Sequence, residues 1–192
     1  ATQLAAELPP DQQAAVAVWV AMRQDPVPAL ENALKQPESA ALRGALASGW
    51  EPIAKKDPAP AENVWQRARQ ILHFTEQESA AVESALGMNQ AMRHDAAAIA
   101  RLAAIPDALR SQEASQWLVR IAARENDWAR VLQAAQSIKT DNERDAAPWQ
   151  YWQARALEAL GKKPEAASMY ANITQHTTFY GFLAADHLGQ DY

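Results

Sequence analysis

Apolar residues recur at helical spacing along almost the whole of this 192-residue chain. Alanine makes up roughly a quarter of the sequence, and it has the highest helix propensity of all amino acids. Valine, isoleucine and threonine, which favour strands, are sparse and scattered. The six glycines offer little material for tight β-hairpins. The sequence therefore predicts an all-α protein.

Capping signals divide the periodic pattern into segments. Asp25-Pro26 is typical of an N-cap followed by proline at the first helical position. Thr75-Glu-Gln-Glu78 and Thr140-Asp-Asn-Glu143 each match a capping box. We expect helices near 11–23, 27–35, 38–48, 61–73, 76–92, 95–104, 110–125, 127–138, 145–160, 164–175 and 179–188.

The longest candidate break between these helices is the segment 50–61. It contains Pro52, Pro58 and Pro60, and proline disfavours a helix interior. We interpret 50–61 as a loop or as a seam between subdomains. In either case residues 1–192 are expected to form a single helical array.

Two neighbouring stretches show pairing most clearly. The stretches are 110–125 and 127–138, and only about two residues, Glu125 and Asn126, separate them. We therefore expect their helices to lie antiparallel. Both follow the i, i+3, i+4, i+7 pattern of one buried helix face. The apolar stripes are Ala114, Trp117, Leu118, Ile121 and Ala122 in the first stretch, and Trp128, Val131, Leu132, Ala135 and Ile138 in the second.

The following pair, 145–160 with 164–175, has the spacing of a tetratricopeptide-type hairpin. Small side chains at Ala154 and Ala166 let two helices approach closely, and Gly161 allows the turn. Leu157 and Tyr170 fill the seam between the helices. Hairpins of this kind stack, because one alone cannot bury its apolar face. The predicted fold is a right-handed superhelix of antiparallel helix pairs, a TPR-like α-solenoid.

Charge and composition exclude several classes of partner. The net charge is −5, and the basic residues are spread along the chain rather than gathered into the stripe that a polyanion needs. We therefore expect no nucleic-acid partner. No apolar run approaches the roughly 20 residues of a membrane span, so we expect no membrane insertion. The first residues, Ala-Thr-Gln-Leu-Ala, lack the features of a signal peptide.

Motifs for cofactors and metals are missing from the sequence. There is no cysteine, and the histidines at 73, 94, 176 and 187 lie far apart. A phosphate-binding loop and a Gly-x-Ser-x-Gly elbow are also absent. We expect no cofactor and no metal site. Four glutamates are interpreted as solvated or as complementing helix dipoles: Glu31, Glu83, Glu143 and Glu158.

The seven tryptophans fall into two groups. Four lie on apolar stripes and are expected in the core: Trp19, Trp117, Trp128 and Trp152. Three could be buried or could stack on sugar rings from a concave face: Trp50, Trp65 and Trp149. Tyr151 and Arg155 lie off the stripe that contains Trp149, so they face either a groove or the solvent.

An ordered set of motifs occupies the end of the chain. A Trp-x-Tyr-Trp-x-Ala-Arg helix precedes a glycine turn and an aromatic-Tyr helix that ends near a tyrosine. The residues are Trp149, Tyr151, Trp152, Ala154, Arg155, Gly161, Phe179, Tyr180, Ala184 or Ala185, Leu188, Gly189 and Tyr192. In this order they resemble the non-catalytic helical region of the soluble lytic murein transglycosylases.

The resemblance implies a periplasmic bacterial protein that acts on peptidoglycan. In that family a separate lysozyme-like domain cleaves the glycan with one glutamate as acid and then base, leaving a 1,6-anhydro sugar. Its motif is Glu-Ser with an aromatic residue and a proline, followed by Gly-Leu-Met-Gln. This chain has neither continuation. Glu38-Ser39 and Glu78-Ser79 match the first two letters, but we interpret them as helix-start residues and assign no catalytic residue.

The leading hypothesis is the helical region of such an enzyme without its catalytic domain, inactive alone. It would position glycan strands for the lysozyme-like domain of the same parent chain. Possible contacts with the glycan or that domain are Trp149, Tyr151, Arg155 and Tyr180. A helical-repeat adaptor for a protein or peptide is the alternative. A complete enzyme of another type is a third hypothesis.

Overall fold

The computed structural model describes residues 7–56 and 58–191 of the chain. Within these residues it contains eleven α-helices and no strand, which confirms the all-α prediction. The helices are α2 (Pro10–Gln24), α3 (Pro26–Ala33), α4 (Ala40–Lys56), α5 (Pro58–Ile71), α6 (Glu76–Met92), α7 (Ala97–Ala104), α8 (Gln112–Arg124), α9 (Trp128–Ser137), α10 (Glu143–Ala159), α11 (Lys163–Ile173) and α12 (Phe179–Leu188).

Side-chain caps fix several of the helix starts. At α6 the Thr75 side chain accepts from the backbone N–H of Glu78 and the Glu78 side chain accepts from Thr75, so the predicted capping box is confirmed. The second predicted box is wrong, because Asn142 rather than Thr140 caps α10. Asp25 does precede Pro26 at the start of α3, but its side chain makes no capping hydrogen bond.

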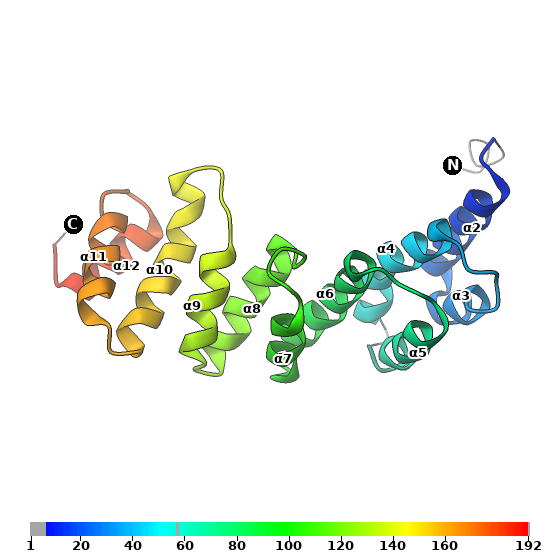
Figure 1. The fold of residues 1–192 in the computed structure, drawn as a ribbon. Coiled ribbons are helices and arrows are strands. Elements are labelled where there is room, and N and C mark those ends of the chain that lie inside the picture. Colours follow the sequence, from blue (N-terminus) through cyan, green and yellow to red (C-terminus); the bar gives the residue numbers. More distant parts are fainter. Residues whose placement is uncertain (1–6, 57, 192) are drawn as a thin grey trace.

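The helices follow one another in an elongated row from the blue N-terminal end to the red C-terminal end (Figure 1). Helices α2, α4, α6 and α8 pack successively against one another, and α3, α5 and α7 lie along one side of them. Beyond α8 the row continues through the serial pairs α8–α9, α9–α10, α10–α11 and α11–α12. Of the described helices, none has the length and apolar character of a membrane span.

The loop expected over 50–61 is wrong for most of that range. Helix α4 continues to Lys56 with Pro52 inside it, and α5 begins at Pro58. The side chains of Trp50, Ile53 and Ala54 are completely buried. Their packing outweighs the penalty of about 3 kcal/mol for an internal proline. One apolar cluster runs across this segment from α2 to α6, and a subdomain seam here stays a prediction.

Tryptophan burial differs from expectation. Trp50 and Trp65, which the sequence left open, are buried against each other with ring centroids 5.4 Å apart. Trp19, expected in the core, is 38 % exposed and carries the Arg23 guanidinium over its ring at 4.7 Å. The buried stripe of α2 instead contains Val18 and Met22, and Trp19 lies one position beside it.

The C-terminal helices have a core of their own. The predicted seam residues of α10 and α11 are buried: Ala154, Leu157, Ala166 and Tyr170. Gly161 turns the chain between these helices with φ of +79°, a conformation that glycine adopts without steric cost. This core extends onto α12 through Ala184. The packing brings Tyr151 of α10 toward Tyr180 of α12.

Candidate functional site

Three of the four expected site residues meet at the C-terminal end of the row. The rings of Tyr151 on α10 and Tyr180 on α12 lie 5.5 Å apart between centroids. Tyr151 Oη and Arg155 Nη1 both contact His187 Nε2, at 3.3 and 3.2 Å. Tyr151 is buried, whereas Arg155 and Tyr180 are half-buried. The exposed part of this cluster is therefore formed by Arg155, Tyr180 and His187.

The carboxylate of Glu158 also belongs to this cluster. It accepts a hydrogen bond from Tyr170 Oη at 3.1 Å and lies 3.3 Å from His187 Nδ1. Arg155 and Glu158 thus contact the two different nitrogens of the His187 ring. Burial, followed by the charge of Glu158, raises the pKa of Tyr170 above its ordinary value. Tyr170 therefore stays a neutral hydrogen-bond donor.

Trp149, the fourth expected residue, belongs to a different part of the molecule. Its ring packs partly buried against the apolar cluster of α6 to α10. The guanidinium of Arg120 on α8 lies 5.6 Å from the ring centroid. Trp149 therefore faces the α8 side of the row, and the structure does not join it to the other three residues.

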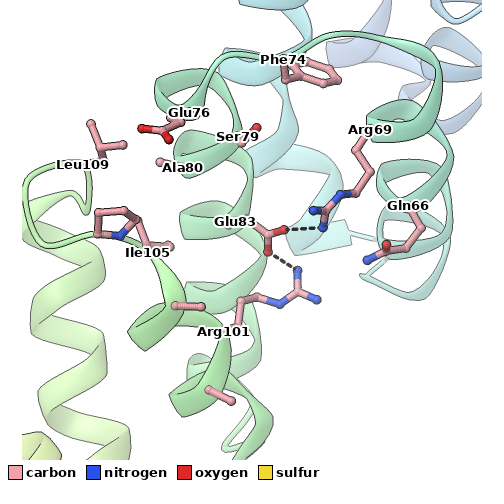
Figure 2. Close-up of a pocket in the computed structure, with 13 residues that line it drawn as sticks. Gln66, Arg69, Phe74, Glu76, Ser79, Ala80, Glu83, Arg101, Ile105 and Leu109 are labelled. Carbon is pink, nitrogen blue, oxygen red and sulfur yellow. Dashed lines mark hydrogen bonds and ion pairs between the residues drawn. The ribbon is translucent and has the colours of Figure 1, made fainter.

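A second candidate lies in the middle of the row, in a groove between α5, α6 and α7. It has a volume of about 570 Å³. Figure 2 shows Glu83 of α6 between Arg69 of α5 and Arg101 of α7. We call this the α5–α7 groove and define it by its lining residues: Gln66, Arg69, Phe74, Glu76, Ser79, Ala80, Glu83, Ala100, Arg101, Ala104, Ile105, Pro106 and Leu109.

The carboxylates beside the α5–α7 groove are held in fixed positions. Glu83 Oε1 accepts from Trp65 Nε1 at 2.8 Å, and its Oε2 accepts from Arg101 Nη1 at 3.0 Å. Arg101 Nη2 also donates to Glu62 Oε2 at 2.6 Å. Burial pushes the pKa of Glu62 upward, but hydrogen bonds from Arg101 and Gln66 outweigh burial and leave this pKa below its ordinary value. Glu62, Glu83 and Arg101 are thus paired with one another beside the groove.

Sequence reasoning missed this groove. We interpreted Glu83 as solvated or dipole-complementing, but its side chain is 23 % exposed and joins three helices. Glu158 also has specific partners, whereas Glu143 is indeed exposed. Glu83 and Arg101 are 18 positions apart, so no local spacing signals their contact. Among the described residues, no group of three or more histidines and acidic residues could hold a metal ion.

Comparison with known proteins gives a likeness among solved structures. Neither the family models nor the curated protein sequences contain a match. Among solved structures, an inactive mutant of the lytic transglycosylase Slt from Pseudomonas aeruginosa superimposes with a TM-score of 0.77. The likeness covers 100 % of this chain at 26 % sequence identity. The helical fold of this chain is thus similar to part of a lytic transglycosylase. It spans 31 % of the length of the Pseudomonas protein.

Two glutamates of this lytic transglycosylase-like domain match the first letters of the family's catalytic motif, and both have structural partners. Glu78 completes the capping box of α6 and pairs with Arg43 at 3.2 Å. Glu38 accepts from the backbone N–H of His73 at 2.9 Å and from Arg43 at 2.8 Å. Glu78 therefore acts at a helix start, as the sequence indicated, whereas Glu38, just before α4, links this helix start to the backbone that follows α5. Tyr192, the last residue of the resemblance, lies outside the described residues.

Proposed function

We propose that this domain positions peptidoglycan glycan strands for cleavage by a lysozyme-like domain of the same parent protein, in the periplasm of a bacterium. The observation that carries the proposal is the likeness of the whole chain to one part of a lytic transglycosylase. As part of this proposal, the helix pairs form a right-handed, TPR-like superhelix whose concave face follows the strand. An elongated row of helices can contact a polymer over a greater length than a globular domain can.

Shape and local contacts, rather than overall charge, would supply the binding energy. The domain carries a net charge of −5, and peptidoglycan also carries carboxylates. We propose that Arg155 and Tyr180 contact the glycan or the neighbouring catalytic domain, with Tyr151 as their buried support and Trp149 as a separate contact. Each would add a hydrogen bond or a stacked ring, worth about 1 kcal/mol. The resulting affinity for short glycans is expected to be weak.

Co-sedimentation of the purified chain with peptidoglycan sacculi tests the proposal. We expect the chain to sediment with sacculi and to release no 1,6-anhydro products. Titration with soluble muropeptides, followed by NMR, should give dissociation constants on the order of millimolar. Failure to sediment with sacculi would contradict the proposal, as would submicromolar binding of a short muropeptide. Release of anhydro products would instead establish a complete enzyme.

A pair of variants locates the contact. Tyr180→Ala should weaken sedimentation if the C-terminal cluster binds the glycan. Trp19→Ala is the matched control, because Trp19 is an exposed aromatic residue at the opposite end of the row. An equal loss in both variants would show that exposed aromatic rings adsorb to sacculi without a specific site. Far-UV circular dichroism checks that each variant keeps its helices.

A further inference from the structure

The two arginines of the α5–α7 groove differ in how fully they are paired. Arg101 is 16 % exposed and donates to both Glu62 and Glu83. Arg69 is 53 % exposed, and its Nη1 lies 3.6 Å from Glu83 Oε1, beyond hydrogen-bond distance. That oxygen already accepts from Trp65 Nε1. Arg69 is therefore the less fully paired of the two arginines, and its guanidinium fork is available to an anionic group in the groove.

A rigid base supports Arg69. Its guanidinium lies 5.9 Å from the centroid of the buried Trp65 ring. The same ring is fixed through its indole nitrogen to Glu83, and Glu83 is fixed to Arg101. A cation held near an aromatic face and one carboxylate oxygen loses little conformational entropy when a ligand binds. The geometry favours a bidentate partner, and a carboxylate matches the guanidinium fork.

The other end of the α5–α7 groove combines apolar side chains with the Glu76 carboxylate. In Figure 2, Ile105 and Leu109 lie on the far side of Glu83 from Arg69, with Ala80 nearer to them. Ala100, Ala104 and Pro106 complete this wall. A volume of about 570 Å³ is within the usual range for small-ligand sites. The groove thus offers the Arg69 guanidinium at one end and, at the other, an apolar wall beside the Glu76 carboxylate.

The groove offers a sugar ring a single aromatic partner among its described lining residues. This residue is Phe74, whose ring makes a T-shaped contact with Trp65 at 5.1 Å and an interplanar angle of 63°. Stacking of a pyranose would therefore rest on this one ring. A short peptide with small alkyl side chains and a free carboxylate matches both ends of the groove.

We propose that the α5–α7 groove binds a free carboxylate of a short, small-residue peptide, with the Arg69 guanidinium as its partner and the Ile105–Leu109 wall against its alkyl groups. This inference rests on the proposed function, because the stems of peptidoglycan are peptides of this class. The middle of the helix row would then bind the peptide stem of a glycan strand. This contact would be separate from any contact at α10 to α12.

The experiment titrates the whole chain by NMR with a stem peptide released from peptidoglycan and with the same peptide amidated at its carboxylates. The free peptide should shift the resonances of α5–α7 residues, and amidation should weaken binding at least fivefold. Arg69→Gln should weaken binding of the free peptide about fivefold to tenfold. Arg67→Gln should leave it unchanged. Arg67 is the matched control, because it lies on α5 with 54 % exposure and pairs with Glu31.

Three results would overturn the inference. Equal weakening by both arginine variants would show long-range charge attraction in place of a site. Equal affinity for the free and the amidated peptide would show that the carboxylate does not contribute to binding. Binding of a stem-free glycan in the same groove with equal affinity would make the sugar the ligand. Thermal unfolding of each variant confirms the fold, which an exposed arginine should not affect.

Co-sedimentation separates failure of this inference from failure of the proposed function. If the unaltered chain binds sacculi but the free stem peptide does not compete and Arg69→Gln has no effect, the groove proposal is wrong and the proposed function stands. If the unaltered chain does not bind sacculi, the proposed function fails. The peptide titration then still reports on the groove directly.

Discussion

The imidazole ring of His187 stacks on the phenol ring of Tyr170, with ring centroids 4.7 Å apart and ring planes inclined by 7°. His187 is on α12 and Tyr170 on α11, and the Tyr151 hydroxyl and Glu158 of α10 contact the same imidazole. One side chain therefore links the last three helices. The position of α12 depends on this link and on a small apolar core.

His187→Ala should destabilise the C-terminal helices by about 1–2 kcal/mol, since it removes a stacked ring pair and a hydrogen bond. Hydrogen exchange of α12 amides should accelerate more than exchange in α4. The control is His176→Ala, whose ring lies 3.6 Å from the exposed carboxylate of Glu143. A loss of protection spread evenly over the row would argue against a local link.

Gly181→Ala should destabilise the protein by at least about 2 kcal/mol, because a Cβ there would lie 2.1 Å from the carbonyl oxygen of His176. That oxygen belongs to the backbone and cannot rotate away. Gly44→Ala is the opposite case, since a Cβ at this exposed position of α4 meets nothing within 4 Å. It should stabilise the protein by about 0.5–1 kcal/mol. Urea unfolding of both variants measures the contrast, and a stabilised Gly181→Ala would contradict the described entry into α12.

Glu38 should make the stability of the protein depend on acid pH. Hydrogen bonds from the ring and backbone of His73, followed by Arg43, lower the pKa of Glu38 to about 2. A group with a lowered pKa in the folded state contributes stability that is complete above its ordinary pKa of 4.5 and is lost as pH falls toward 2. Glu38→Gln should therefore lower the melting temperature at pH 6, and the difference from the unaltered protein should shrink between pH 4.5 and 2. Parallel melting curves across that window would contradict the role of Glu38.

Arg110→Met should cost about 2–4 kcal/mol of unfolding free energy. Arg110 is buried and donates to the carbonyl oxygens of Leu102 and Ile105 at the end of α7. It also donates to Ser115 and pairs with Asp107. Methionine keeps most of the volume but removes these hydrogen bonds and takes from the Ile105 carbonyl its Arg110 donor, while the Leu102 carbonyl keeps the backbone N–H of Ile105. Arg124→Met, at an exposed arginine 3.7 Å from Glu125, should change stability by less than about 0.5 kcal/mol.

Much of the fold follows from local signals in the sequence. The capping box at Thr75 and the turn at Gly161 act within one turn of a helix, so the expected ends of α6 and α10 are close to those observed. The alanine seam between α10 and α11 is also local in sequence, and its residues are buried as expected. Helix identity and nearest-neighbour pairing are thus encoded over short spans.

The parts that sequence reasoning missed depend on distant partners. Pro52 indicates a break, yet the buried side chains around it keep α4 intact, and those contacts come from other helices. Trp65 is buried because its ring packs against Trp50 and its indole N–H donates to Glu83, and these two partners lie on two other helices. Arg69 and Arg101 belong to no motif in the sequence, and they come together only because α5 and α7 both pack against α6. A single sequence does not show which of its distant residues come into contact.

The serial packing of the row has a consequence for how the domain forms. Helices in substantial contact are at most two elements apart along the chain. Each helix–helix contact therefore closes only a short segment of chain during folding. Folding with such low contact order is fast and can begin at several places. In the same arrangement, a displacement of one helix acts directly only on the helices next to it in the row. We therefore expect the row to bend elastically. Bending along its length would be distributed over many small helix–helix adjustments, as in a spring.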